Sequence, residues 1–354
     1  MSPHRPVTLG LAGTGRIGTS HAETLKKLPN VATVVVADAD ADRARTTAAV
    51  LGVEFAPDLD TLFAADLDGL IIATATDSHP ELIIRAVDAG IPVFCEKPVA
   101  TDITGTLAVI DHLRDSSVPV QIGFQRRFDA GYRAAREAIR NGSLGWLHTL
   151  RATTLDPAPP PADYIPRSGG IFRDCGVHDF DIIRWVTGRE IVEVYALGAN
   201  RGAAIFAEAD DVDTAAVLLR LDDGALATVS LTRYNGAGYD VRLEALGSKG
   251  NAVVGLDDRA PLTSVEPDHS PSPYPPYGGF MERFRPAYAD ELAAFIEVAT
   301  GRLDNPCAVT DALEAFYIAE ACELSRSEER AVKLAEMRNR AWKSDQHQPD
   351  IARS

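Results

Sequence analysis

An aspartate and a histidine four residues apart are the side chains whose types and spacing most directly suggest chemistry. Asp174 and His178 lie in residues 169–181, a stretch that opens with two glycines and is predicted to begin a helix. Side chains at positions i and i+4 project from one face of a helix. A histidine can take a proton from a hydroxyl group near neutral pH, and a carboxylate one turn away can orient the imidazole. Asp181 is a second candidate partner for His178, whereas a solvated helix face is the alternative for the pair alone.

A lysine follows a predicted strand far from this pair in the sequence. Lys97 is the central residue of Glu96-Lys97-Pro98, directly after the strand predicted over residues 92–95. At the mouth of a cofactor crevice, such a lysine could exchange a proton with a hydroxyl group that is being oxidised. The alternative is a surface lysine paired with Glu96. Pro98 would make this turn rigid, and the bond before it could be cis.

A glycine-rich turn near the N-terminus predicts dinucleotide binding. Gly13, Gly15 and Gly18 form G-x-G-x-x-G between a predicted strand at residues 7–12 and a predicted helix at residues 20–27. In a Rossmann unit the three glycines allow a tight turn, a close approach of backbone to pyrophosphate, and packing of helix on strand. The unpaired N–H groups at the helix start then face the phosphates.

An aspartate follows the next predicted strand. Asp38 comes after residues 32–37, twenty residues beyond the last glycine of the motif. Its carboxylate can accept hydrogen bonds from both ribose hydroxyls and would repel a 2′-phosphate. No arginine is adjacent to it in the sequence, so NAD is favoured over NADP. The alternative is a glycine-rich turn of another α/β protein, with Asp38 capping a helix.

The bulk composition is that of a two-domain globular chain. The chain has 354 residues, of which 45% are hydrophobic and 24% charged, and a formal net charge of −16. This acidity argues against nucleic acid or an anionic membrane as a partner. The four cysteines form no C-x-x-C pair. No third zinc-type ligand accompanies Asp174 and His178, so no metal is expected. No signal peptide or membrane span is evident, which favours a reducing, cytoplasmic location.

Apolar strands and helical patterns alternate up to about residue 122, which predicts a parallel sheet with right-handed crossovers. The strands are expected at residues 7–12, 32–37, 69–73, 92–95 and 119–122. The helices are expected at residues 20–27, 41–51, 80–89 and 103–116, with a short helix near residues 58–63. Ligands of such sheets bind at the carboxyl ends of the strands. Asp38, residues 74–79 and residues 96–98 are expected at those ends.

The second part is predicted to be an open, mostly antiparallel sheet with helices. Its strands are expected at residues 147–155, 191–199, 213–221, 226–232 and 240–245. Its helices are expected at residues 128–141, 172–187, 290–300 and 310–328, with an irregular proline-rich loop or lid at residues 261–276. The predicted fold class is thus α/β plus α+β. The domains are residues 1–123, which bind NAD, residues 124–340, which bind substrate and oligomerise, and a tail at residues 341–354.

These motifs together resemble the glucose–fructose oxidoreductase and inositol dehydrogenase family (Gfo/Idh/MocA) over nearly the whole chain. The resemblance is carried by G-x-G-x-x-G, by Glu96-Lys97-Pro98, by Gly123-Phe124-Gln125-Arg126-Arg127-Phe128-Asp129 and by the stretch from Gly169 through Asp174 and His178 to Asp181. Within the family, residues 123–129 and Gly238-Tyr239-Asp240-Val241 are most similar to inositol 2-dehydrogenases.

The resemblance implies a catalytic set and two sets of binding residues. Lys97 and Asp174 would hold and polarise the reacting hydroxyl, and His178 would be the general base. The implied cofactor contacts are Gly13, Gly15, Arg16, Ile17, Asp38, Thr74, His79, Glu96, Lys97 and Gln125. The substrate contacts are the catalytic set with Gln125, Arg127, Asp156 and Tyr239. For Arg127 the alternative is an ion pair with Asp129 or a neighbouring carboxylate, and for Tyr239 it is packing in a strand.

The expected function is therefore the NAD-dependent oxidation of a small neutral polyol or sugar, with conversion of myo-inositol to scyllo-inosose as the leading candidate. Cys175-Gly176 replaces bulkier residues of inositol dehydrogenases, which leaves the substrate more open than the chemistry. The alternatives are a sugar or aminosugar dehydrogenase and a non-catalytic NAD-binding sensor, although a sensor needs no acid–base set. The uncovered face of the second sheet suggests an oligomer, and the family implies a homotetramer.

Overall fold

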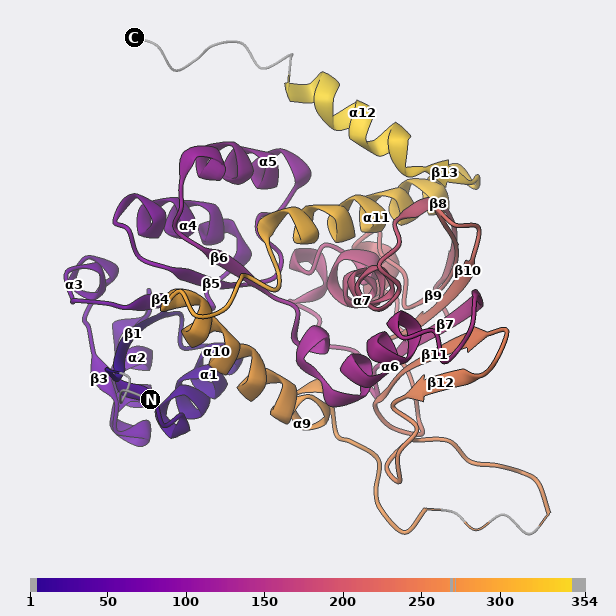
Figure 1. Cartoon of the computed structure of the whole chain (residues 1–354), viewed down its shortest axis with the longest axis horizontal. Helices are drawn as coiled ribbons and strands as arrows, with labels where there is room; N and C mark the ends of the chain where they lie inside the picture. The colour runs from indigo at the N-terminus through magenta and orange to yellow at the C-terminus, as the bar shows by residue number, and fades with distance from the viewer. Residues whose placement is uncertain (1–4, 268–269, 271, 346–354) are drawn as a thin grey trace. The chain divides into compact units, whose positions relative to one another are not determined.

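The computed structural model describes residues 5–267, 270 and 272–345, which form two compact units (Figure 1). Unit 1 comprises residues 5–125 and 286–313, and unit 2 comprises the described residues of 126–285 and 314–345. Of the predicted tail at residues 341–354, the part from residue 346 onward lies outside the described residues. The first boundary between the two units follows residue 125, two residues after the predicted domain boundary at residue 123.

A parallel sheet forms the centre of unit 1, as predicted, and it contains a sixth short strand, β3, that was not predicted. Its strands are β1 Val7–Ala12, β2 Val31–Ala37, β3 Glu54–Phe55, β4 Gly69–Ile72, β5 Val93–Glu96 and β6 Val120–Gly123. Their order is β3-β2-β1-β4-β5-β6, and every neighbouring pair is parallel. The order reverses between β1 and β4, which is the switch point where doubly wound sheets bind ligands.

Helices connect these strands, and aspartates fix where several of them begin. The helices are α1 Arg16–Lys27, α2 Ala41–Leu51, α3 Leu59–Phe63, α4 His79–Asp88 and α5 Ile103–His112. The side chains of Asp40, Asp58 and Asp102 accept hydrogen bonds from backbone N–H groups in the first turns of α2, α3 and α5. Helix α1 differs, because its N-cap residue is Gly15 and makes no side-chain cap.

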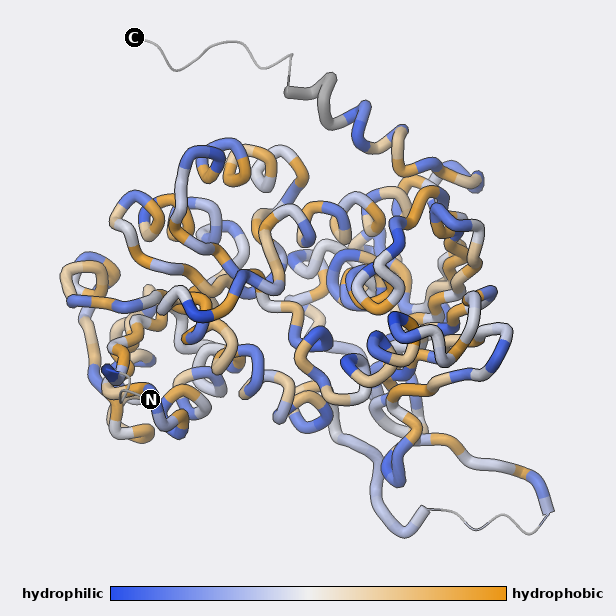
Figure 2. The backbone as a smooth tube through the Cα atoms, in the orientation of Figure 1, coloured by the Kyte–Doolittle hydropathy of each residue, from blue (hydrophilic) through white to orange (hydrophobic). Residues whose placement is uncertain are grey.

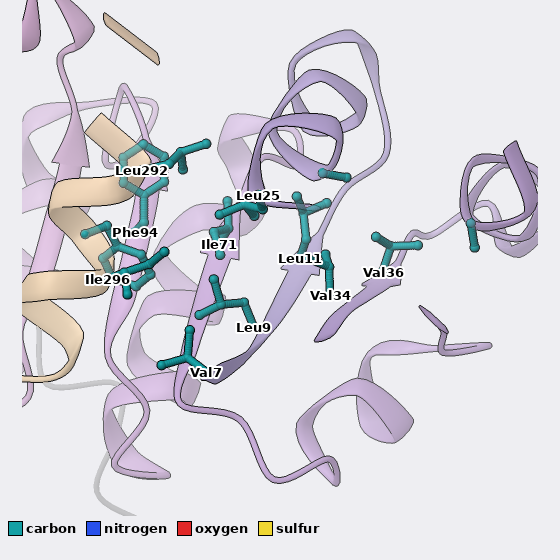
Figure 3. Close-up of a cluster of buried hydrophobic side chains, with 13 residues drawn as sticks. Val7, Leu9, Leu11, Leu25, Val34, Val36, Ile71, Phe94, Leu292 and Ile296 are labelled. Carbon is teal, nitrogen blue, oxygen red and sulfur yellow. The ribbon is translucent and has the colours of Figure 1, made fainter. Parts of the chain in front are cut away.

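A helix from late in the sequence completes the core of unit 1. Leu292, Phe295 and Ile296 of α10 (Arg285–Ala299) share a buried cluster with Val7 and Leu9 of β1 (Figure 3). The sequence assigned this helix to the second domain, whereas the structure places residues 286–313 in unit 1. The physical reason is apolar burial: Phe295 is fully buried, which contributes about 2 kcal/mol. Local periodicity cannot reveal which core a helix joins.

Unit 2 is built on a seven-stranded sheet that is mostly antiparallel, as expected. Its strands are β7 Leu147–Leu155, β8 Ile191–Ala199, β9 Thr214–Leu221, β10 Leu226–Thr232, β11 Asp240–Gly247, β12 Asn251–Val254 and β13 Val332–Lys333. The order is β12-β11-β7-β10-β9-β8-β13. Among the described strand pairs of this second sheet, only β7–β10 is parallel. The short strands β12 and β13 were not predicted, because two to four residues carry little alternating pattern.

Helices accompany this sheet, whose strands alternate buried and exposed residues. The helices are α6 Ala130–Arg140, α7 Val177–Thr187, α8 Ile205–Glu208, α9 Phe280–Arg283, α11 Val309–Glu328 and α12 Leu334–Asp345, and α11 begins in unit 1. Figure 2 shows hydrophobic and hydrophilic residues intermixed along these elements, as burial of one face requires. The single helix predicted at residues 172–187 is instead a π-helical turn, Phe172–Gly176, followed by α7.

The proline-rich loop is irregular wherever it is described. Residues 261–276, apart from 268, 269 and 271, contain no helix or strand, which agrees with the prediction for the described part. None of the helices in the described residues is long and apolar enough to cross a membrane.

Candidate active site

The glycine loop of unit 1 has the shape that a pyrophosphate site requires. Gly13 follows β1 with a φ of +95°, and a Cβ atom built on Gly18 would lie 1.8 Å from the carbonyl oxygen of Gly13. Neither position can carry a side chain. A Cβ atom on Gly15 would meet nothing within 4 Å, so the loop is open there. Gly15 makes no side-chain cap at the start of α1, and the start of a helix favours an anion, so these residues fit NAD.

Asp38 lies at the carboxyl end of β2, as predicted, and is held from several sides. Its Oδ2 atom accepts hydrogen bonds from the backbone N–H of Thr14 at 2.6 Å and from the Thr14 hydroxyl at 2.9 Å. The guanidinium of Arg43 also pairs with the carboxylate. Burial opposes ionisation of Asp38, but the Arg43 guanidinium and the N–H groups of Thr14 and Asp40 outweigh it and lower the pKa.

The contact with Arg43 corrects one inference from the sequence. No arginine is adjacent to Asp38 in the chain, yet the first turn of α2 returns Arg43 to it, with Nε 3.2 Å from Oδ2. The Arg43 side chain is 50% exposed, so it can move when another partner takes the carboxylate. This end of the glycine loop therefore carries both a carboxylate and a guanidinium, and Asp38 alone does not set its charge.

The ends of β4 and β5 carry the next group of predicted site residues. His79 is buried, with Nδ1 2.8 Å from the carbonyl oxygen of Pro98 and Nε2 3.2 Å from that of Thr74. Burial lowers the pKa of His79, because it penalises the charged imidazolium. Its ring thus joins the two loops that carry Thr74 and Lys97, and the Lys97–Pro98 peptide bond is cis. Lys97 itself is half-buried.

A histidine that the sequence argument did not single out contacts the same loop. His21 of α1 is 1% exposed, and its Nε2 atom lies 2.6 Å from Oε1 of Glu96. The ring also packs edge-on against Phe94 and Tyr288. This contact ties the first turns of the helix after the glycine loop to the residue before Lys97. The signal in the sequence that could have identified His21 is its place three residues after Gly18, the last glycine of the motif.

The predicted acid–base pair of unit 2 lies where a π-helical turn meets α7. Asp174 belongs to the π turn, and His178 is the second residue of α7; both are half-buried. A π turn contains one more residue than an α-helical turn and often marks a functional site. Gly170 precedes it with a φ of +89°, a conformation that favours glycine.

A buried arginine links the two acids of this site. The Nη2 atom of Arg233 donates to Oδ2 of Asp174 at 2.7 Å, and its Nη1 atom lies 3.2 Å from Oδ2 of Asp156 and 2.9 Å from Sγ of Cys175. The Tyr164 hydroxyl donates to Oδ1 of Asp174 at 3.0 Å. Burial raises the pKa of Asp156, although the Arg233 charge opposes this effect. The structure therefore brings the predicted residues Asp156 and Asp174 together.

Two further arginines pair with acids of α7. Arg127 is buried, and its Nε atom donates to Oδ2 of Asp181 at 2.9 Å. This is the ion-pair alternative considered for Arg127, with Asp181 rather than Asp129 as the partner. Arg126 donates to Oδ1 of Asp179 at 2.6 Å, and both groups are buried.

Asp129 has different partners. It caps α6 through the N–H groups of Gly131 and Tyr132, and it pairs with Arg283 at 2.8 Å. Asp181, which the sequence suggested as a partner of His178, forms its ion pair with Arg127.

The remaining predicted pocket residues are well buried. Gln125 and Tyr239 are each 5% exposed, and burial raises the pKa of Tyr239 well above its usual value. The backbone of Tyr239 also forms a bridge with Tyr277, which agrees with the packing alternative. The missing side chain at Gly176 creates no open space, because a Cβ atom there would lie 3.0 Å from Leu231 and from Phe180. Within the described part of the chain, no group of three or more acidic, histidine or cysteine side chains is placed to hold a metal ion.

Unit 1 has a glycine loop shaped for a dinucleotide and a lysine at a strand end. Unit 2 has a histidine four residues after an aspartate that contacts an arginine. Histidine and lysine are side-chain types that can exchange a proton with a hydroxyl group. Arg233 and Tyr164 were not identified from the sequence, because isolated residues outside a motif carry no spacing signal.

Sequence and structure comparisons place the chain among known oxidoreductases. Residues 7–124 match an oxidoreductase family with an NAD-binding Rossmann fold, and residues 132–253 match the GFO/IDH/MocA C-terminal domain. The chain is 38% identical over 336 residues to the myo-inositol 2-dehydrogenase of Thermotoga maritima, covering 93% of this chain and 99% of that protein. It is 37% identical over 330 residues to an inositol 2-dehydrogenase of Rhizobium meliloti, covering 93% and 99%.

A solved structure of similar fold contains both ligands of such an enzyme. The scyllo-inositol dehydrogenase of Lactobacillus casei, with bound NAD(H) and scyllo-inositol, aligns with a TM-score of 0.84 and 29% sequence identity. The alignment covers 93% of this chain and 99% of that one. The chain belongs to the GFO/IDH/MocA family of oxidoreductases, whose N-terminal domain is an NAD-binding Rossmann fold.

Proposed function

We propose that this chain oxidises a hydroxyl group of a cyclic polyol to a ketone with NAD, and that its substrate is myo-inositol, which becomes scyllo-inosose. The observation that carries the proposal is the match along nearly the whole chain to relatives named inositol 2-dehydrogenases. The presence of Lys97, Asp174 and His178 supports catalysis rather than sensing, because an NAD-binding sensor needs no acid–base set.

Each of three side chains has one task in this reaction. His178 takes the proton of the reacting hydroxyl while the hydrogen on the same carbon leaves as hydride. NAD, when bound, supplies the acceptor for that hydride. Lys97 and Asp174 hold and polarise the hydroxyl, so that the oxygen keeps one orientation as its proton leaves.

The cofactor and substrate contacts follow from the same proposal. The residues proposed to hold NAD are Gly13, Gly15, Arg16, Ile17, Asp38, Thr74, His79, Glu96, Lys97 and Gln125. Asp156 and Gln125 bind substrate hydroxyls, and Tyr239 closes the pocket by packing. Arg127 acts through its ion pair with Asp181. Arg233 pairs with both Asp156 and Asp174, so these acids and Lys97 together leave no net charge in the proposed substrate site, which suits a neutral polyol.

Assembly and location are part of the proposal. Leu197, Leu218 and Leu226 are about half-exposed, and the strand registers place them on one face of the second sheet. Burying this apolar face against other copies of the chain supports a homotetramer. The absence of a C-x-x-C pair in the sequence supports a reducing, cytoplasmic setting.

The direct test of the function is formation of reduced cofactor from NAD and a substrate panel. We expect an increase in the absorbance of NADH with myo-inositol that is larger than with any aldose or aminosugar. A signal with an aldose alone would move the assignment to a sugar dehydrogenase. Tight NAD binding without turnover of any polyol or sugar would indicate a sensor and contradict the proposal.

Replacement of Lys97 separates chemistry from cofactor binding. Lys97→Ala should lower kcat about 10²- to 10⁴-fold, because the reacting hydroxyl loses its polarising partner. Binding of NAD, measured by fluorescence titration, should persist. Lys27→Ala is the matched control. Lys27 is exposed, and its Nζ atom pairs with Glu23 on the surface of α1. Normal turnover in Lys97→Ala would remove this lysine from the catalytic set.

Replacement of Asp38 tests the ribose site. Asp38→Ala should weaken NAD binding about tenfold or more, because the ribose hydroxyls lose a charged acceptor. It should also improve use of NADP, since Arg43 is then released to face a 2′-phosphate. The measurement is kcat/KM for both cofactors, with Asp42→Ala as the control, because Asp42 is an exposed acid of α2. An unchanged cofactor preference would contradict the assigned role of Asp38.

A further inference from the structure

The backbone on both sides of Arg233 is fixed by the ends of two strands. Its own N–H donates to the carbonyl oxygen of Asp213 at 2.8 Å. The N–H of Asp156, directly after β7, donates to the carbonyl oxygen of Thr232 at 2.9 Å. Arg233 and Asp156 therefore leave adjacent parallel strands, β10 and β7, at a spacing that the sheet sets.

The Arg233 side chain is as constrained as its backbone. It is 3% exposed, and its two terminal nitrogens contact different carboxylates. A guanidinium is planar and always charged, so its two nitrogens hold their partners in one geometry. Asp174 is also held on its other oxygen by the Tyr164 hydroxyl. Because donors reach both oxygens, the rotation of the Asp174 carboxylate is restricted.

Arg233 compensates the charge of the two carboxylates that it contacts. Partly desolvated carboxylates near each other favour protonation of one of them. Burial already raises the pKa of Asp156, and Arg233 is the first group that counters it. A rotated Asp174 would no longer hold a substrate hydroxyl in the orientation that proton transfer needs.

We infer that Arg233 is a positioning residue for the reaction, which fixes Asp174 and Asp156 as a pair of carboxylates that bind hydroxyls on neighbouring carbons of the substrate. The inference rests on the proposed function, because it takes Asp174 and Asp156 as substrate contacts. Nη1 and Nη2 belong to one planar group, so the spacing of the two acids follows from the guanidinium itself. The ligand class is a cyclic polyol with vicinal hydroxyls.

Arg233→Lys is the variant that tests this role. It keeps the positive charge but loses the fork that reaches two acids at once. We expect kcat/KM for myo-inositol to fall about 10- to 100-fold, which is the cost of a small misplacement of a catalytic group. The Kd for NAD should stay within about twofold, because Arg233 lies in unit 2 and the dinucleotide loop in unit 1. Arg184→Lys is the matched control, since Arg184 is a buried arginine of α7 that pairs with Glu190.

A second pair of measurements separates positioning from general stability. Arg233→Ala should lose most activity with myo-inositol and recover part of it when guanidinium chloride is added at non-denaturing concentrations, but not with sodium chloride at equal ionic strength. Tyr164→Phe removes only the donor on the other oxygen of Asp174 and should give a smaller loss in kcat. Thermal unfolding of each variant is recorded alongside.

The outcomes distinguish the inference from the function on which it rests. A wild-type chain that oxidises myo-inositol, with an Arg233→Lys variant that retains the wild-type kcat/KM, would overturn the inference alone. Loss of folding in Arg233→Lys as well as Arg233→Ala, with no change in Tyr164→Phe, would show a structural role and also overturn it. A wild-type chain that oxidises no polyol would overturn the proposed function and the inference together.

Discussion

Charge compensation along one short segment is the constraint on which the proposed substrate site depends. Residues 174–181 carry three aspartates, at positions 174, 179 and 181, and each pairs with an arginine from elsewhere in the chain. The partners are Arg233, Arg126 and Arg127, in that order. Removing one partner of a buried pair leaves an uncompensated charge, which costs about 3–5 kcal/mol. His178 lies within this locked segment, so its place is set by ion pairs that do not involve the histidine.

A different constraint shapes the cofactor site of unit 1. There the important feature is missing side chains, since Gly13 and Gly18 have no room for a Cβ atom and Gly15 leaves the loop open. Side-chain contacts then connect the loops at the strand ends. His79 joins the loops after β4 and β5, and His21 joins α1 to Glu96. Two buried histidines thus give rigidity to a site that the glycines make accessible.

Much of the fold and the outline of both sites could be predicted from the sequence. G-x-G-x-x-G, the strand after it and Asp38 have fixed spacing along the chain, so local patterns were sufficient. The approach of Arg43 to Asp38 depends on how α2 turns back, and the pairing of Arg127 with Asp181 depends on contacts between residues 54 positions apart. The packing of α10 in unit 1 likewise depends on tertiary burial. An amphipathic pattern shows that one face of a helix is buried but does not show against which sheet.

The same limit explains the unpredicted features around Asp174. A π turn differs from an α-helix by one hydrogen-bond step, and the residues at 172–176 show no pattern that distinguishes the two. Arg233 is 59 residues beyond Asp174 and follows an ordinary strand, so only the sheet brings them together. The sequence predicted candidate residues for the chemistry, whereas the contacts of Arg233 and Tyr164 with Asp174 became visible only in three dimensions.

A crystal structure of the chain with NAD and myo-inositol would show whether the proposed catalytic side chains meet at one hydroxyl. We expect the His178 imidazole and the Lys97 ammonium both to lie within hydrogen-bond distance of one substrate hydroxyl, with the carbon that bears it facing the nicotinamide ring. We also expect Asp174 and Asp156 to contact hydroxyls on neighbouring carbons while they remain paired with Arg233. An imidazole of His178 remote from the substrate, or a polyol bound away from Lys97, would contradict the account.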